Sequence, residues 1–457
     1  MEELNRIASE CYMRVLAVQD QGDGIGTARF LEESLALFRK LNDSRGIAWS
    51  LHKLGVGAWR RGNYVRAQTI QEESLAMLRE LADQPGIAWS LHALGNIARD
   101  QGDNAKAVTH YQESLALFRE LNDRRGIAWS LHNLGTTVQD QAGLQGAAKH
   151  LEESLALFRA LDDRRGIAWA LHNSGLIARD QNDYEQAKAH YEESLTLFRE
   201  LDDTQGIAWS LHDLGTLARY AGDYMQAERL QAESLSLFRS SDDYRGIAWA
   251  LRDLGVLARY QRQFDRATTH YLESLKLFRE LGDRRGTAWT TRNLATIMRY
   301  QRQYERAAAL YEESLGLFRD VGDQRGIAWS LRSLGSLAYD MGERLRAASL
   351  LQESLARFAE LNDKRMIAWS FQNLALIARD QADYLRAARL LGAAQALRDD
   401  LGAPLPLADR VTYDDTYSAL ERYLGTTKFT IALSEGDGME LEDAVEYALE
   451  ASVTADG

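Results

Sequence analysis

Small and apolar residues recur along the chain at the spacing of one helix face. In residues 163–202 the first such run contains Leu171, Gly175 and Ala178. Residues three to four positions apart share a face of an α-helix, so this run predicts an amphipathic helix. The polar sequence DQND at 180–183 interrupts the pattern and predicts a turn.

A second helix is predicted from about residue 184 to residue 201. Asp163 precedes the first helix, where its carboxylate can accept hydrogen bonds from the free N–H groups of the first turn. Neither helix can bury its apolar face alone, so neighbouring helix pairs must stack on one another. The packing face of the second helix consists of Ala187, Tyr191, Ser194, Leu195 and Phe198.

The whole pattern repeats every 40 residues. Aspartate, alanine and glycine columns keep the same register as a ladder of tryptophans, while exposed positions of the second helix differ from unit to unit. A repeat of this length that contains two helices predicts an α-solenoid. The ladder comprises nine tryptophans, namely Trp49, Trp89, Trp129, Trp169, Trp209, Trp249, Trp289, Trp329 and Trp369.

The motif L-x-x-L-G-x-x-A, followed by (G/N)-D-Y-x-x-A-x-x-x-Y-x-x-S, resembles the tetratricopeptide repeat. The resemblance implies an all-α, right-handed superhelix of about ten helix-turn-helix units whose concave groove is lined mainly by the first helices. We expect a degenerate first repeat at residues 1–47, nine regular units at 48–407 and a helical cap at 408–457. Three features depart from the usual pattern: the period is 40, leucine stands at the first signature aromatic position, and the closing proline is missing.

Two further resemblances concern the turn and the tail. The EL-x-D-x-x-G-x-A turn is similar to that of long-repeat scaffolds of the LGN/Pins type. The tail, with RAARLLGAAQALRDDLGAPLPLADR and MELEDAVEYAL, resembles the C-termini of bacterial signal-transduction ATPases and LuxR-type regulators. Helices are expected at 408–424 and 440–452, starting near Asp409 and Glu440.

Composition narrows the functional classes. The formal net charge of −13 opposes general nucleic-acid binding. The single cysteine, Cys11, precludes a disulfide within the chain and is in keeping with a reducing, cytoplasmic location. No phosphate-binding, metalloprotease or nucleophile-elbow motif occurs, so we expect no enzyme activity and no cofactor. Histidines one per repeat are about 8–10 Å apart, too far to share a metal ion.

A polar stripe runs beside the packing face of each first helix. The residue three positions after the tryptophan is histidine in the early repeats and arginine in later ones. The residue eleven positions after the tryptophan likewise changes from aspartate to tyrosine. By resemblance this stripe lines the groove, and Trp, Tyr and Arg dominate binding hot spots. The candidate ligand-binding residues are Trp129, His132, Trp169, His172, Arg179, Trp209, His212, Arg219, Tyr220, Trp249, Arg252, Arg259, Tyr260, Trp289, Arg292, Arg299, Tyr300 and Arg332.

Each tryptophan could pack between adjacent first helices, contact a ligand, or do both. The leading interpretation is a non-enzymatic scaffold that binds a protein or peptide with acidic residues in its groove. The alternatives are a ligand- or peptide-sensing module of a bacterial regulator and a self-assembling structural solenoid. Stacking of nucleic-acid bases on the aromatic residues is a weaker option.

Overall fold

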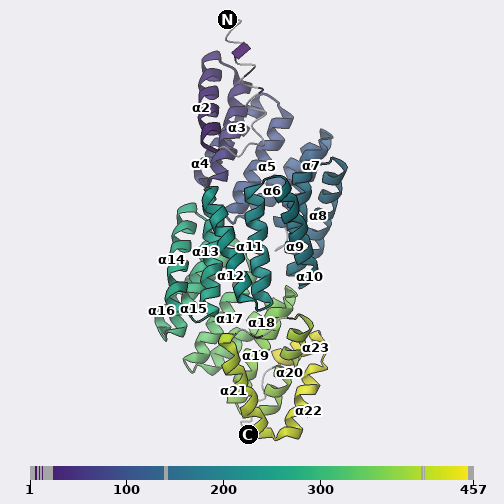
Figure 1. Ribbon diagram of the computed structural model, residues 1–457, viewed down its shortest axis with the longest axis vertical. Coiled ribbons are helices and arrows are strands. Elements are labelled where there is room, and N and C mark those ends of the chain that lie inside the picture. The colour runs from purple at the N-terminus through teal and green to yellow at the C-terminus, as the bar shows by residue number, and fades with distance from the viewer. Residues whose placement is uncertain are drawn as a thin grey trace. The chain divides into compact units, whose positions relative to one another are not determined.

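A computed structural model describes residues 6, 7, 10, 13, 24–137, 143–402, 405 and 407–450. Within these residues the chain is all-α, with 22 helices arranged as paired helix-turn-helix repeats (Figure 1). The chain divides into two compact units. The first contains residues 1–174, 238–245 and 280–283, and the second contains 175–237, 246–279 and 284–457.

The helix boundaries follow the 40-residue period. The first helices of the repeats are α3 (Ser44–Arg60), α5 (Gln84–Asp100), α7 (Arg124–Thr137), α9 (Arg164–Asp180), α11 (Thr204–Tyr220), α13 (Tyr244–Tyr260), α15 (Arg284–Tyr300), α17 (Gln324–Asp340) and α19 (Lys364–Asp380). The second helices are α4 (Tyr64–Glu80), α6 (Asn104–Glu120), α8 (Gly143–Ala160), α10 (Tyr184–Glu200), α12 (Tyr224–Ser240), α14 (Phe264–Leu281), α16 (Tyr304–Val321), α18 (Arg344–Glu360) and α20 (Tyr384–Asp400). The remaining helices are α2 (Gly24–Leu41), α21 (Leu407–Leu424), α22 (Thr426–Asp437) and α23 (Leu441–Leu449).

An aspartate caps the start of the first helices, as the sequence predicts. The carboxylate of Asp163 accepts a hydrogen bond from the backbone nitrogen of Gly166 at 2.9 Å, and Asp323 accepts one from Gly326 at 2.8 Å. This satisfies a donor that the helix itself leaves free. The residue before the cap has a left-handed backbone, as at Asp162 with φ 52°. The predicted break at 180–183 lies between the end of α9 and the start of α10.

The second helices supply the largest buried side chains. Tyr191 and Phe198 are fully buried, together with Ala187 and Ser194. The serine of this column donates a hydrogen bond to an alanine carbonyl of the preceding first helix, for example Ser114 to Ala88 at 2.9 Å. The same bond recurs from Ser74, Ser154, Ser234, Ser274, Ser314 and Ser354 at 2.8–2.9 Å. The serine column therefore fixes the close crossing of consecutive helices.

A glycine near the start of most first helices accommodates a phenylalanine ring. A Cβ atom at Gly326 would overlap the Phe318 ring. Trp289 packs on the same ring, with centroids 4.9 Å apart. In the last repeat Met366 takes the place of this glycine, and the corresponding Trp329–Phe358 separation is 6.2 Å. The side chain at this position displaces the ring from the tight contact that glycine permits.

Gly326→Ala is expected to destabilise its repeat by about 1–3 kcal/mol, because the added methyl group overpacks the core. The measurement is the shift in the urea unfolding midpoint, followed by circular dichroism. Gly316→Ala is the matched control. Nothing lies within 4 Å of a Cβ atom at this exposed position in α16, so alanine should stabilise the helix by about 0.5–1 kcal/mol. A loss of stability in both variants would refute the steric explanation.

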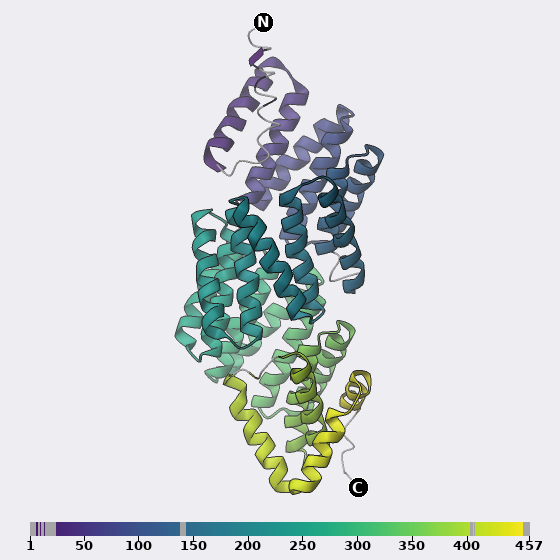
Figure 2. The same cartoon turned by 45° about the vertical axis from the view of Figure 1, so that its right-hand side comes forward.

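The C-terminal helices pack on the last repeats (Figure 2). Helices α21 and α23 lie close to the predicted ranges 408–424 and 440–452, whereas α22 was not predicted from the sequence. A Cβ atom at Gly392 of α20 or Gly436 of α22 would overlap the backbone of the opposite helix, so these glycines allow α20 and α22 to approach closely. Glu440 precedes α23 without a side-chain capping bond, and the side chain of Asp409 lies outside the described residues.

Candidate functional site

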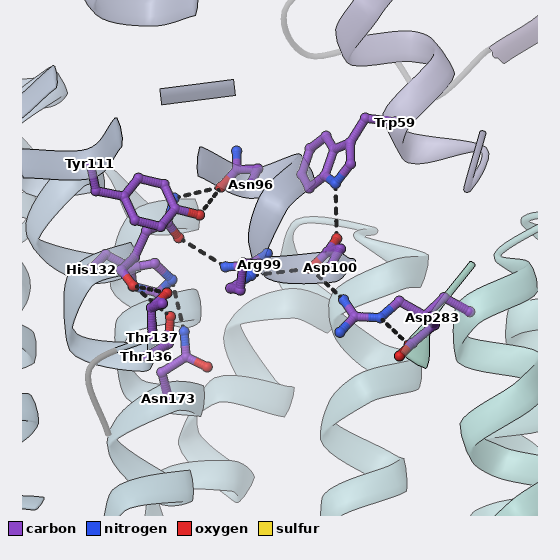
Figure 3. A network of polar contacts seen from close by, with 12 residues as sticks. Trp59, Asn96, Arg99, Asp100, Tyr111, His132, Thr136, Thr137, Asn173 and Asp283 are labelled. Carbon is purple, nitrogen blue, oxygen red and sulfur yellow. Dashed lines mark hydrogen bonds and ion pairs between the residues drawn. The ribbon is translucent and has the colours of Figure 1, made fainter. Parts of the chain in front are cut away.

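The histidines of the polar stripe lie in the interfaces between successive first helices. In the first unit, Nε2 of His92 lies 2.9 Å from the amide nitrogen of Asn133. Nε2 of His132 lies 2.8 Å from the amide nitrogen of Asn173 (Figure 3). In the second unit, His212 lies 3.4 Å from the carboxylate of Asp253. We call this column of contacts the inner ladder.

Burial keeps the early histidines of the inner ladder uncharged. The pKa of His52 falls from 6.5 to about 3, chiefly through desolvation and then through the nearby Lys53. Desolvation also lowers the pKa of His92 to about 4 and that of His132 to about 3. His132 and His172 are each 4% exposed and His212 is 6% exposed, so the predicted histidines form interior contacts.

The tryptophan rings make contacts within their own helix and with the second helix that follows. Trp129 meets His132 of its own helix edge to face, with ring centroids 5.4 Å apart, and meets Phe158 of the next second helix at 5.0 Å. The predicted tryptophans are half-buried, namely Trp129, Trp169, Trp209, Trp249 and Trp289. Packing therefore accounts for one part of each ring, and the remaining exposed part is what a ligand could contact.

Arginine replaces histidine in the later repeats and changes the electrostatics. The guanidinium of Arg292 lies between the rings of Trp289, at 5.4 Å, and Trp329, at 4.6 Å. Arg252 stacks on Trp249 at 4.6 Å, and Arg332 stacks on Trp369 at 4.4 Å. This alternation of aromatic and cationic groups is a row of cation–π contacts.

Arg292 is the most deeply buried of these arginines, at 7% exposure. Its hydrogen bonds go to the hydroxyl of Ser333 at 3.1 Å and the side-chain oxygen of Asn293 at 2.9 Å, and both acceptors are uncharged. Desolvation, together with the neighbouring Arg259 and Arg332, lowers the pKa of Arg292 to about 9. A buried guanidinium without a carboxylate is costly, and an anion beside it would lower that cost.

The C-terminal ends of the first helices carry a second group of candidate residues. Arg179 contacts Asp180 at 3.0 Å and Asp213 at 3.4 Å. In later repeats tyrosine replaces the aspartate, and an arginine lies over its ring. These pairs are Arg219 over Tyr220 at 4.6 Å, Arg259 over Tyr260 at 4.4 Å and Arg299 over Tyr300 at 5.2 Å.

Contacts between residues 145 positions apart form a third feature. In the first unit Arg245 contacts Asp100 at 2.7 Å, and Asp100 also accepts hydrogen bonds from Trp59 at 2.8 Å and Arg99 at 3.1 Å (Figure 3). In the second unit Arg325 contacts Asp180 at 2.9 Å. These contacts bring the start of one first helix against the end of a first helix more than three repeats earlier.

Sequence reasoning missed these partners. The column Asn133, Asn173 and Asp253 was visible as a polar position directly after the histidine or arginine, and that polarity was its signal. Arg245 and Arg325 gave no signal, because a contact over 145 residues depends on the superhelical geometry and not on the 40-residue period. The bond from Trp59 to Asp100, 41 positions later, was not predicted either, because Trp59 lies outside the tryptophan ladder.

Across the part of the chain that the structure describes, no group of three or more His, Cys, Asp or Glu side chains is arranged to hold a metal ion. None of the described helices combines the length and apolar character needed to cross a membrane.

The stacked helix pairs define an α-helical repeat protein. The tetratricopeptide repeat model matches residues 86–160, 166–240, 206–280 and 246–320, and a second tetratricopeptide repeat model matches residues 47–84. These matches cover half of the chain, which therefore belongs to the tetratricopeptide repeat family. No match was found among the curated proteins.

Solved structures share the fold. A Rap protein complexed with Competence and Sporulation Factor aligns with a TM-score of 0.54 and 13% identity, over 70% of this chain and 99% of that chain. The Rap conjugation gene regulator of plasmid pLS20, in complex with the Phr* peptide, aligns with a TM-score of 0.53 and 12% identity, over 70% and 96%. BtubC (BKLC) from P. vanneervenii aligns at 24% identity over 49% and 94%, with a TM-score of 0.37.

Proposed function

We propose that this protein is a non-enzymatic scaffold that binds a protein or peptide along the inner side of its repeats. Membership of the tetratricopeptide repeat family supports this role. So does the similarity in fold to a Rap protein complexed with Competence and Sporulation Factor and to a Rap regulator in complex with the Phr* peptide. The ligand-binding residues are those of the polar stripe, from Trp129 to Arg332.

Arg292 is the observation on which the chemistry of the ligand rests. Within the part of the chain that the structure describes, its buried guanidinium donates hydrogen bonds to the uncharged side chains of Ser333 and Asn293. Arg259 and Arg332 lie close enough to lower its pKa. An acidic side chain of a partner, placed against these arginines, would offset the repulsion and form charge-assisted hydrogen bonds. We therefore propose a ligand segment with acidic residues.

Arg259→Gln together with Arg299→Gln is expected to weaken binding of this ligand by about tenfold or more, because two cationic contacts are lost. The measurement is fluorescence anisotropy with a pool of labelled peptides rich in Asp and Glu, followed by identification of the peptides retained. We chose these arginines because both side chains are partly exposed, so the variant should keep its fold.

The matched control is Arg306→Gln together with Arg346→Gln. It makes the same change in charge on second helices, where Arg306 bonds to Gln303 and Arg346 pairs with Glu343. Equal affinity of the two double variants for the acidic peptides would refute the placement of the site. Failure of the wild-type protein to retain any peptide would count against the proposed function itself.

A peptide-sensing role is the second candidate. One of the similar structures is described as a conjugation gene regulator with a bound peptide, and this observation favours a regulatory module over a passive scaffold. A sensor must change conformation when it binds. Small-angle X-ray scattering with and without the retained peptide separates the two, since a passive scaffold would keep its radius of gyration.

A further inference from the structure

Three arginines occupy the same position near the start of their repeats. Each contacts the last residue of an earlier first helix, 145 positions before it in the sequence. Arg245 reaches Asp100 in the first unit, while Arg325 reaches Asp180 in the second. Arg365, also in the second unit, lies directly over the ring of Tyr220 at 3.9 Å. We call these three contacts the clasps. The constant spacing shows that they arise from the geometry of the repeats and not from one local accident.

The clasps compete with a contact that other members of the column retain. Arg45 and Arg125 pair with the aspartate that begins the following repeat, at 2.9 Å and 3.3 Å. In two of the clasps the distance from the arginine to this aspartate is longer, at 3.7 Å from Arg245 to Asp283 and 4.0 Å from Arg325 to Asp363. The guanidinium groups of the clasps are thus turned towards the earlier helix.

The clasps are also more enclosed than the other pairs. The side chains of Arg245 and Arg325 are 29% and 22% exposed, against 61% for Arg45. In the first unit, Leu281 packs beside this contact on a cluster that includes Tyr64 and Ile97. In the second unit, the side-chain nitrogen of Asn182 donates to the carbonyl of Asn362 at 3.1 Å. Ion pairs held in such surroundings are screened less by salt than exposed pairs.

The clasp at Tyr220 covers a residue of the proposed binding face. Arg365 and Arg219 both lie over the Tyr220 ring, at 3.9 Å and 4.6 Å. Burial raises the pKa of Tyr220, but these arginines and Arg179 outweigh it, so the pKa lies below its usual value. Asp180, beside the candidate Arg179, is likewise engaged by Arg325. A ligand that contacts this end of the first helices must displace the clasp.

We infer that the clasps are an autoinhibitory contact: Arg325 and Arg365 hold a later turn of the superhelix over Asp180 and Tyr220, and the ligand binds after this turn has moved away. The inference rests on the proposed function for the identity of the ligand, but the clasp itself exists independently of any ligand. In energetic terms the free protein is held in a closed state, and the ligand favours an open one.

The test uses the full chain with Arg325→Gln and Arg365→Gln. Asp180 keeps Arg179 as a partner, so the substitution leaves no unpaired carboxylate. The radius of gyration, measured by small-angle scattering without ligand, should rise, and hydrogen exchange should increase around residues 177–184 and 217–224. The same acidic peptide pool should bind about fivefold or more tightly, the lower range of typical coupling between sites.

Arg45→Gln together with Arg125→Gln is the matched control, because both residues occupy the same column and their side chains are 61% and 50% exposed. They pair with Asp83 and Asp163 of the next repeat, and their loss should change neither the radius of gyration nor peptide affinity. A clasp variant that behaves like this control overturns the inference. So does a variant that opens but binds no more tightly than the wild type.

A locked form keeps the test valid if the clasp variant unfolds. Replacing Cys11 with serine removes the only thiol, after which Asn182→Cys and Asn362→Cys can be joined by a short bis-maleimide. The cross-linked protein should stay compact and lose peptide binding, whereas unimpaired binding overturns the inference. If no form binds any peptide, the proposed function fails, while scattering and hydrogen exchange still decide whether the clasp holds the turns together.

Discussion

Asp100→Asn is expected to destabilise the first unit by about 3–5 kcal/mol, the usual cost of breaking a buried charged network. The carboxylate is 6% exposed and contacts Arg99 at 3.1 Å and Arg245 at 2.7 Å. Burial raises the pKa of Asp100, but these two arginines outweigh it and hold the pKa below its usual value. Asparagine would leave two enclosed guanidinium groups facing a neutral amide.

Hydrogen exchange of peptides from α3 and α5 measures this loss within the first unit. Asp340→Asn is the control, because Asp340 occupies the same column but is 34% exposed and pairs with Arg299 at 3.5 Å. Pairs of this kind contribute at most about 1 kcal/mol. If the two variants exchange at similar rates, the Asp100 network does not stabilise the first unit.

Lowering the pH from 7 to 5 is expected to remove about 6 kcal/mol of stability through three histidines. His52, His92 and His132 have folded pKa values of about 3, 4 and 3, against 6.5 in an unfolded chain. Below pH 6.5 the unfolded state therefore binds more protons, and each histidine costs about 2 kcal/mol at pH 5. Stability is complete above pH 6.5 and declines as the pH falls towards the folded values.

The measurement is urea unfolding of the first-unit helices between pH 4.5 and 7.5. The triple variant His52→Gln, His92→Gln and His132→Gln should lose most of this pH dependence, since glutamine does not titrate. Asp100 and Asp180, whose pKa values are held low, affect stability only at lower pH. A triple variant with the slope of the wild type would show that the inner ladder does not set the acid sensitivity.

The fold was accessible from the sequence because its determinants are local and repeated. Asp163, Ala187 and Phe198 act within one or two adjacent helices. The aspartate and the alanine recur in every regular repeat, and the phenylalanine recurs in most of them. The packing faces and helix boundaries predicted for residues 163–202 accordingly agree with α9 and α10. Helix α22 was not predicted, because its contact with α20 depends on Gly392 and Gly436, and neither glycine recurs in the other repeats.

The candidate site was less accessible. Helical periodicity placed Trp169 and His172 on a stripe beside the packing face, but it did not reveal how much of the stripe the next repeat covers. Burial of His172 depends on the angle between neighbouring first helices, and the sequence of a single repeat does not determine this angle. Binding by the stripe stays a prediction. The contact between Arg325 and Asp180 depends further on how many repeats complete a turn.

The 145-residue spacing bears on how such an array can change in length. Loss of one 40-residue unit between Asp180 and Arg325 would bring Arg365 to the position that Arg325 now occupies, with the same side chain presented. Unequal recombination between near-identical units could thus shorten or lengthen the gene and still restore this contact. The contact is not restored where the column lacks arginine, as at Gln205. Elsewhere the arginine column makes the array tolerant of insertion and deletion in steps of whole repeats.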